Sequence, residues 1–196
     1  MNALIPTTLT SEAIKEKAKE LGADLVGIAD GVLMDRIPPD PAIPRTPSHI
    51  TEVDGARVIV LAKRISFATS RLPAWNDQHK FYGDELLISA VEELALNLVF
   101  WMEDNGAPAL LVPYHHVDPL KFEKGKDTQA THPLSAEHAA VEAGLGTLGL
   151  NHQLITPEYG PRVILGLVMT SADLEPDTKM ETALCLGPNC GRCLKA

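Results

Sequence analysis

Basic residues are scarce in this chain. Its 17 lysines and arginines stand against 26 aspartates and glutamates, which gives a net charge of −9 and a sequence pI near 5.2. Nucleic-acid affinity comes largely from lysine and arginine side chains that displace counterions from phosphates. The charge balance therefore argues against nucleic acid as a partner and favours small molecules or proteins, and nothing in the sequence indicates a local basic patch.

Long apolar runs and a secretion signal are also missing. The longest apolar stretch, residues 94–101, is interrupted by Asn97 and falls far short of the roughly 20 residues that a membrane span requires. The N-terminal sequence MNALIPTTLT has neither a basic nor an apolar signal region. Apolar residues make up 45% of the 196 and charged residues 22%, as in an ordinary globular domain. We expect a cytoplasmic protein without membrane association.

Cysteine is absent until the last twelve residues, which contain Cys185, Cys190 and Cys193. An odd number of cysteines in a chain without a secretion signal argues against disulfides. Cys190 and Cys193 have the middle spacing of the ferredoxin motif C-x2-C-x2-C-x3-C-P, whereas four residues rather than two separate Cys185 from Cys190. The spacing favours an iron–sulfur ligand set over zinc, which stays the alternative. Either set is incomplete, so we expect that the chain is cut within the motif.

Helical and strand patterns alternate along the sequence. Apolar periodicity and cap residues predict helices at 11–21, 84–105 and 135–143, the last with Ser135 as its N-cap. Buried strands are predicted at 25–29, 57–65, 109–112 and 163–170. Five prolines in residues 37–47 indicate an ordered loop. This order predicts an α/β or α+β fold with a central sheet.

Two motifs in the sequence resemble cofactor signatures but have the wrong context. Residues 144–149 read GLGTLG, yet a dinucleotide fingerprint requires a strand before it and a helix after it, and here the order is reversed. A structural turn and a ligand-contacting turn both explain these glycines. Residues 77–83, DQHKFYG, are one residue too long for the Asp-x-His-x-x-Gly signature that supplies a histidine to cobalt. We therefore expect His79 to lie in a polar loop.

One family combines the remaining features. Residues 135–170 and the cysteine run resemble the core of the epoxyqueuosine reductases and reductive dehalogenases, including their ferredoxin-domain relatives. The matching pieces are HAA at 138–140, AGLG at 143–146, Gly149 and TPEYGPRV at 156–163. The early helix and the segment GADLVGIAD at 22–30 are also similar, while the likeness is weak between residues 30 and 84.

The resemblance implies a nitroreductase-like domain over residues 1–180, with a central mixed sheet that holds base-off cobalamin. Residues 181–196 would begin a ferredoxin-like module with a 4Fe-4S cluster, and its implied ligands are Cys185, Cys190 and Cys193. A corrin ring is broad, largely apolar and fringed by amides, so it requires apolar walls and closely approaching backbone. The implied cofactor contacts are His138, Gly144, Leu145, Gly146, Thr147, Leu148, Gly149, Asn151 and Tyr159.

The proton donor is the point at which the resemblance is weakest. Epoxyqueuosine reductases carry an acidic residue shortly before the Ala-Gly-Leu-Gly stretch. Here the nearest comparable segment is residues 113–118, PYHHVD, and the loop that follows it is longer. Tyr114, His115 and Asp118 are the candidates, because each acts as an acid when its pKa is tuned. The alternative for each is a solvated loop residue.

The sequence thus predicts a cobalamin-dependent reductase that receives electrons from 4Fe-4S clusters and reduces a small-molecule substrate. A ferredoxin, a flavodoxin or a reductase would be its electron donor. The net charge favours a small substrate over tRNA, which stays open because further sequence could supply a basic face. An iron–sulfur electron-transfer protein and a non-catalytic corrinoid-binding module are the alternatives. The oligomeric state is left undetermined.

Overall fold

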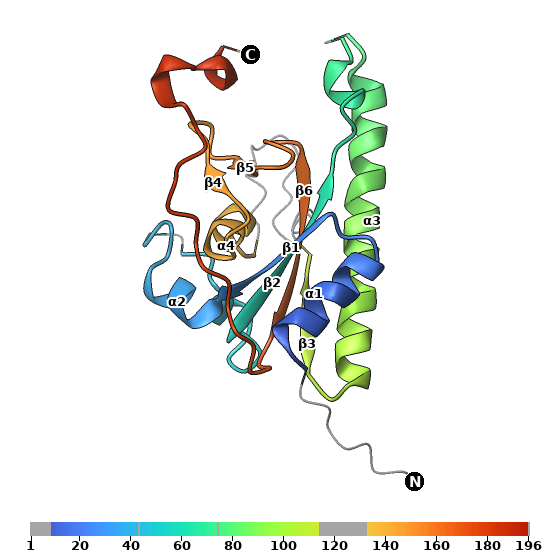
Figure 1. Ribbon diagram of the computed structural model, residues 1–196, viewed down its shortest axis with the longest axis vertical. Helices are drawn as coiled ribbons and strands as arrows, with labels where there is room; N and C mark the ends of the chain where they lie inside the picture. Colours follow the sequence, from blue (N-terminus) through green and yellow to red (C-terminus); the bar gives the residue numbers. More distant parts are fainter. Residues whose placement is uncertain (1–8, 43, 74, 114–132, 196) are drawn as a thin grey trace, which may run out of the picture.

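The computed structural model describes residues 9–42, 44–73, 75–113 and 133–195. In these ranges, four helices and six strands form the fold, in addition to short 3-10 turns (Figure 1). The elements in chain order are α1 (Ser11–Glu20), β1 (Leu25–Asp30), α2 (Gly31–Arg36), β2 (Arg57–Arg64), α3 (Asp77–Asp104), β3 (Ala109–Val112), α4 (Ala136–Glu142), β4 (Thr147–Leu148), β5 (Leu154–Ile155) and β6 (Val163–Thr170). Within these described ranges, no helix is both long and apolar enough to cross a membrane.

The central sheet has the strand order β1-β2-β6-β3, and every neighbouring pair in it is antiparallel. The α/β class is confirmed, but a mixed sheet was expected. Strands β2 and β3 do run in the same direction with α3 as the connection between them. They are not neighbours, however, because β6 lies between them and pairs with both. β2 and β3 are therefore parallel, as the alternation of helices and strands implied, but they share no backbone hydrogen bonds.

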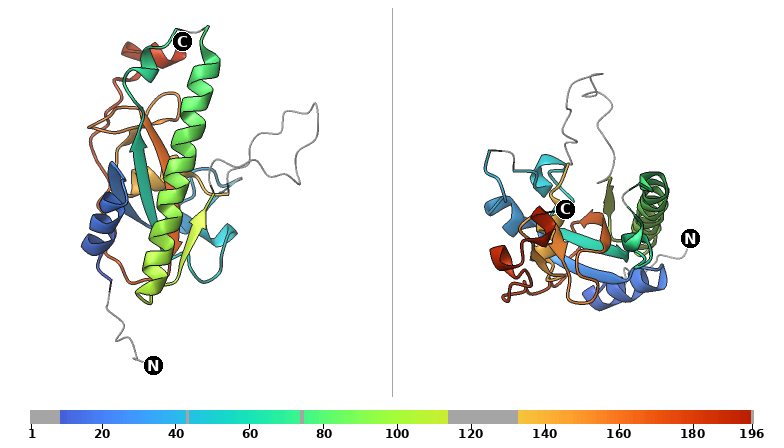
Figure 2. Two further views of the ribbon diagram at one scale, coloured as in Figure 1. Left: turned by 90° about the vertical axis from the view of Figure 1, so that its right-hand side faces the viewer. Right: turned by 90° about the horizontal axis from the view of Figure 1, so that it is seen from above.

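Helices cover both faces of this sheet (Figure 2). Side chains of a strand point alternately to opposite faces, and β2 shows this directly. Ile59 and Leu61 join the buried cluster beneath α1 and α3, whereas Val58 and Val60 join the cluster beneath α2 and α4. A sheet that is buried on both faces requires apolar residues at almost every strand position. This explains why the β2 and β6 sequences are nearly uninterrupted apolar runs.

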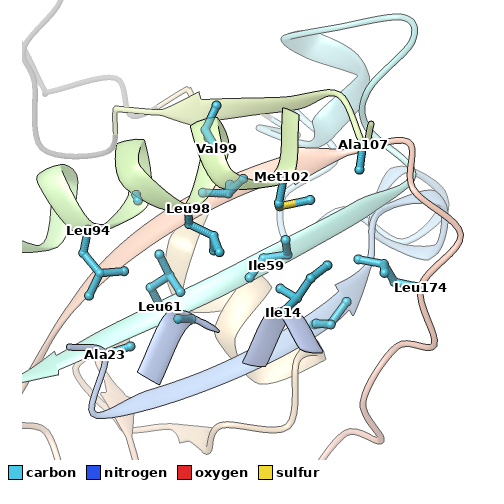
Figure 3. Close-up of a cluster of buried hydrophobic side chains, with 14 of the residues drawn as sticks. Ile14, Ala23, Ile59, Leu61, Leu94, Leu98, Val99, Met102, Ala107 and Leu174 are labelled. Carbon is cyan, nitrogen blue, oxygen red and sulfur yellow. The ribbon is translucent and has the colours of Figure 1, made fainter. Parts of the chain in front are cut away.

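The first of these clusters packs the long helix α3 against the sheet. Leu98 and Met102 of α3 are fully buried and lie close to Ile59 of β2 and Ile14 of α1 (Figure 3). Complete burial of one such side chain contributes roughly 1.5–3 kcal/mol. The helical periodicity of apolar residues predicted from the sequence is confirmed for this part of α3, which is the part that contacts the sheet.

The N-terminal end of α3 differs from the prediction. The helix begins at Asp77 instead of residue 84, because the side chain of Asn76 caps it by accepting a hydrogen bond from the His79 amide (3.3 Å). His79 is therefore an exposed residue of the first helical turn and does not lie in a loop. These extra turns, residues 77–83, contain no buried residue, so apolar periodicity alone did not indicate them.

A strap formed by residues 174–184 returns along the edge of the sheet after β6 (Figure 1). The Asp177 amide donates to the Ile28 carbonyl of β1 (2.7 Å), and the Asp177 carboxylate accepts from the Ile28 amide (2.8 Å). The same carboxylate contacts Lys15 of α1 at 2.5 Å. The strap thus covers polar groups of an edge strand that would otherwise be exposed. It also brings the chain back beside the β4–β5 hairpin, which precedes it in the sequence.

Candidate functional site

Helix α4 and the turn that follows it form the centre of the family-like segment. Ser135 occupies the N-cap position of α4, as predicted, but its side chain makes no capping hydrogen bond. Ala139 and Ala140 are fully buried against the sheet. Because these side chains are small, α4 approaches the strands closely, and the turn at residues 143–149 then leads into the β4–β5 hairpin.

The glycines of this turn are required by the protein's own packing. Gly144 has φ +71°, and a Cβ at this position would lie 2.5 Å from the Thr178 carbonyl oxygen of the strap. A Cβ at Gly146 would lie 2.1 Å from the Ile155 carbonyl oxygen of β5. Real Cβ atoms essentially never approach backbone oxygen so closely. A structural turn therefore accounts for both glycines without a ligand.

Other predicted cofactor contacts divide into an inner and an outer set. Thr147 Oγ1 accepts a hydrogen bond from the Leu184 amide (2.9 Å), which ties the strap to β4, and Leu145 packs against the core. Leu148 is 40% exposed, and the exposed Asn151 bonds to Gln153 in the hairpin turn. Leu148 and Asn151, the outer set, are therefore available to a ligand. Leu145 and Thr147, the inner set, contact other parts of the chain.

Gly149 belongs to the hairpin itself. Its amide donates to the Gln153 carbonyl (2.8 Å), and a Cβ at this position would lie 2.9 Å from Asn151 Oδ1. The same turn leaves Leu150 37% exposed, close in sequence to Leu148. The hairpin therefore presents two apolar side chains to its surroundings.

His138 lies on α4 in a charged cluster, in which the side chains of His138 and Glu142 are largely buried and that of Lys179 is exposed. Its Nδ1 is 4.0 Å from Glu142 Oε1, and Lys179 Nζ contacts the same oxygen at 2.5 Å. Burial lowers the pKa of His138, and the Lys179 ammonium acts in the same direction, whereas the Glu142 carboxylate opposes both. The buried Nε2 atom of His138 has no hydrogen-bond partner among the described residues, so the neutral imidazole keeps one unused polar atom.

The TPEYG segment forms a closed loop before β6. Thr156 and Gly160 exchange two backbone hydrogen bonds (2.9 Å each), and Thr156 Oγ1 accepts from the Tyr159 amide (3.1 Å). Thr156 is only 2% exposed, so the loop is anchored by a buried side chain. Its geometry directs Glu158 and Tyr159 toward a pocket at the end of β2.

This pocket has a cavity volume of about 530 Å³. Its lining residues are Arg64, Ile65, Ser66, Phe67, Glu158, Tyr159 and Arg162. Sequence reasoning proposed only Tyr159 among them. Arg64 ends β2 and Arg162 precedes β6, and the pairing of these strands brings the two arginines together. Arg162 belongs to the TPEYGPRV segment, but its pairing with Arg64 was not readable from the sequence.

The three cysteines follow the strap in two short 3-10 turns, Gly187–Asn189 and Arg192–Leu194. Cys185 is half-buried with its sulfur 3.4 Å from the Gly187 amide nitrogen, and Cys190 and Cys193 are exposed. In the part of the chain that the structure describes, no three His, Cys, Asp or Glu side chains come together as a metal site requires. The residues present therefore do not form a cluster site by themselves, and the ligand roles stay a prediction.

The predicted proton donors Tyr114, His115 and Asp118 lie outside the described residues. The division into units at 1–180 and 181–196 also stays a prediction.

A bound corrinoid fits some of these features and not others. The space that a Cβ would fill at Gly144 and Gly146 is already taken by backbone, so these glycines do not form a cradle for a ring. The exposed leucines of the hairpin do suit a large, apolar, amide-fringed molecule. The fit therefore rests on the outer face of the hairpin.

Curated relatives resemble almost the whole chain. An epoxyqueuosine reductase of Synechococcus sp. (strain RCC307) is 27% identical over 214 residues, which cover 98% of this chain and 60% of the relative. An epoxyqueuosine reductase of Listeria monocytogenes is 46% identical over 80 residues, 41% of this chain and 20% of the relative. No protein-family model matches the chain. The chain spans about 60% of the length of the Synechococcus relatives.

Solved structures of two enzyme groups share the fold. The catabolic reductive dehalogenase NpRdhA superimposes with a TM-score of 0.64 at 20% identity, over 87% of this chain and 22% of its own. An epoxyqueuosine reductase bound to a modified tRNA stem loop gives 0.59 at 20% identity, over 94% of this chain and 50% of its own. The chain thus resembles epoxyqueuosine reductases in sequence along most of its length, and it shares its fold with epoxyqueuosine reductases and reductive dehalogenases.

Proposed function

We propose that this chain is the reductase core of a cobalamin-dependent, iron–sulfur-fed oxidoreductase that acts on a small molecule. The observation that carries the proposal is the extent of the likeness, which covers 98% of the chain in sequence and 94% in fold. One structural neighbour, at a TM-score of 0.58, is a reductive dehalogenase for which a B12-dependent mechanism has been suggested. Since the chain covers only part of each relative, the activity itself is an inference.

The chain's own residues would bind the corrinoid at the outer face of the β4–β5 hairpin. Leu148 and Leu150 would contact apolar ring edges, and Asn151 would pair with a peripheral amide. Tyr159 and His138 are further candidate contacts at the two sides of the turn. Gly144 and Gly146 would act indirectly, because they hold the hairpin tightly against the strap. When bound, the corrinoid would supply a strongly reducing cobalt for electron transfer to the substrate.

Proton delivery would come from the segment between β3 and α4. Tyr114, His115 and Asp118 are its candidate acids, and Asp118 is the preferred one. A Bacillus subtilis epoxyqueuosine reductase has an aspartate-bearing catalytic loop that swings out of its active site. By analogy, Asp118 would be the acid that donates the proton to the substrate.

Electrons would reach the site from the end of the chain that carries Cys185, Cys190 and Cys193. These thiolates would require at least one further ligand to hold a 4Fe-4S cluster. A ferredoxin, flavodoxin or reductase would be the external donor. The Leu184–Thr147 hydrogen bond ties this cysteine segment to the hairpin, which would keep donor and acceptor on the same end of the molecule.

The choice between the two substrate classes follows from charge. One neighbour is complexed with 3-bromo-4-hydroxybenzoic acid, and another with a modified tRNA stem loop. A net charge of −9 opposes docking of polyanionic tRNA. We therefore favour a small organohalide or epoxide.

A turnover assay tests this proposal without dependence on the clusters. The chain is reconstituted anaerobically with hydroxocobalamin, reduced with titanium(III) citrate and incubated with 3-bromo-4-hydroxybenzoic acid or with an epoxyqueuosine-modified tRNA stem loop. Reductive debromination consumes two electrons and one proton per carbon–bromine bond and releases bromide, with carbon–hydrogen bond formation. Free hydroxocobalamin under the same reductant is the control, because it measures the background reaction.

Bromide release above this background would support a small-molecule reductase, and epoxide reduction in the tRNA arm would reassign the substrate. Absence of both, with corrinoid still bound, would favour the non-catalytic corrinoid-binding module. Absence of corrinoid together with an assembled cluster would favour the iron–sulfur electron carrier.

A further inference from the structure

The pocket at the end of β2 has a chemistry that a corrinoid reductase does not by itself explain. It shares only Tyr159 with the proposed corrinoid contacts, and it is lined by two arginines in a chain whose net charge is −9. Arginine guanidinium groups offer several N–H donors in a planar fork that suits carboxylate and phosphate oxygens. The N–H donors of Arg64 and Arg162 can bind such an oxyanion if the side chains are held in place and the donors are not all used within the protein.

Arg162 is fixed on the rigid side of the pocket. Its backbone carbonyl accepts from the Ile65 amide (2.9 Å), and its Nη1 donates to the Ile65 carbonyl (3.0 Å). Its guanidinium also lies 5.3 Å from the centroid of the Phe67 ring, within the range of a cation–π interaction. Only one of its donors is used in these contacts, so the remaining N–H groups are preorganised to meet a ligand.

Arg64 lies at the end of β2, the strand that pairs with β6. Its Nε lies 3.4 Å from Asp24 Oδ1, and its guanidinium is 5.9 Å from the centroid of the Tyr159 ring. The Arg64 side chain is 63% exposed, so its interaction with any anion is partly screened by water. Arg162 is therefore the stronger determinant, and Arg64 adds a second positive charge at the rim.

We propose that the pocket between Arg64 and Arg162 binds the oxyanion group of a small organic ligand, a phosphate ester or a carboxylate. The cavity of about 530 Å³ falls within the range of small-molecule sites, roughly 300–1,000 Å³, so the ligand includes an organic part in addition to the anion. Ser66 and Tyr159 supply hydroxyl groups for further hydrogen bonds. Glu158 lines the same pocket and opposes the anion, which limits the affinity.

Calorimetric titration of the full chain with phenyl phosphate at low ionic strength tests the site. Benzyl alcohol serves as the uncharged counterpart of the probe. Arg162→Gln should weaken phenyl phosphate binding about tenfold, since a charge-assisted hydrogen bond is lost, and Arg64→Gln should weaken it less. Glu158→Gln should strengthen it. Arg36→Gln, which makes the same charge change on exposed α2, is the matched control and should leave binding unchanged.

Two results would overturn the inference. One is equal binding of phenyl phosphate and benzyl alcohol, and the other is equal weakening by Arg36→Gln and Arg64→Gln. Because Arg64 is exposed, Arg64→Gln stays informative even where Arg162→Gln disturbs the strand end. The titration uses the chain without corrinoid, so its outcome is independent of the proposed reductase function.

A competition arm then separates two sources of the anion. Hydroxocobalamin carries a phosphodiester in its nucleotide tail. Loss of phenyl phosphate binding after corrinoid loading would support the pocket as the seat of that tail. Unchanged binding would support it as a site for a separate small anion.

Discussion

Gly146 provides a sharp test of whether the glycine turn is structural. A Cβ at Gly146 would meet the Ile155 carbonyl oxygen at 2.1 Å and the Ile155 carbonyl carbon at 2.8 Å. Both contacts are with backbone of the paired strand β5, so no flexible side chain can move aside. Gly146→Ala should therefore push β4 away from β5 and destabilise the fold.

The size of this effect follows from overpacking, which typically costs 1–3 kcal/mol. We expect the upper end, about 3 kcal/mol, because the obstructing atoms belong to the backbone. Gly160 offers a matched control. It has φ +60° and nothing within 4 Å of its Cβ position, so Gly160→Ala measures backbone strain alone, about 1 kcal/mol.

Urea unfolding without corrinoid measures both variants. With an m-value of about 3 kcal/mol per molar, the midpoint should fall by about 1 M for Gly146→Ala and about 0.3 M for Gly160→Ala. A Gly146→Ala midpoint no lower than that of Gly160→Ala would refute the reasoning. In that case the hairpin would have room for a side chain at Gly146, and a ligand-contacting role would again be an explanation for this glycine.

Two further predictions concern the charged contacts of α4 and the strap. Burial depresses the pKa of His138 below 6.5 in the folded chain. Between the two pKa values the unfolded chain therefore binds more protons than the folded chain. The folded state is thus most stable above about pH 6.5, and this stability is lost as pH falls through the folded pKa. His138→Gln should flatten this part of a urea-midpoint profile against pH, whereas His79→Gln, on an exposed helical turn, should not; equal slopes in both variants would contradict this account. Asp177→Ala removes the contact with Lys15 and the hydrogen bond from the Ile28 amide, so the free energy of unfolding should fall by about 2 kcal/mol. A decrease below about 0.5 kcal/mol in the free energy of unfolding, measured with urea, would mean that the Lys15–Asp177 pair contributes no more than an ordinary exposed ion pair.

Local sequence patterns carried most of the fold. The apolar runs of β1, β2 and β6 and the periodicity of α3 were readable because each element buries side chains in the core. The β4–β5 hairpin was not readable, since its strands contain two residues each. Helix α2 is one short element of six residues with only two of them buried, which is too little for a periodic signal.

The candidate site was readable only where function and local structure coincide. The glycines were recognisable as a turn from the GLGTLG pattern, and the TPEYG segment was recognised through its resemblance to the family. The meeting of Arg64 and Arg162 was not predicted, although Arg162 lies in the TPEYGPRV segment, because the two arginines meet through strand pairing over a long sequence separation. Asp177 was also missed, because its partners Lys15 and Ile28 belong to the opposite end of the chain.

The central claim is that this chain binds a corrinoid on the outer face of its hairpin. The most direct measurement is the absorption spectrum of the chain after anaerobic incubation with hydroxocobalamin and desalting, together with two leucine variants. Leu148 and Leu110 are 40% and 38% exposed, and Leu110 lies on strand β3 away from the hairpin. We predict a retained base-off corrinoid in the wild type and with Leu110→Ser, and reduced retention with Leu148→Ser. Absence of corrinoid in all three would contradict the account, and equal retention by both variants would move the binding face away from the hairpin.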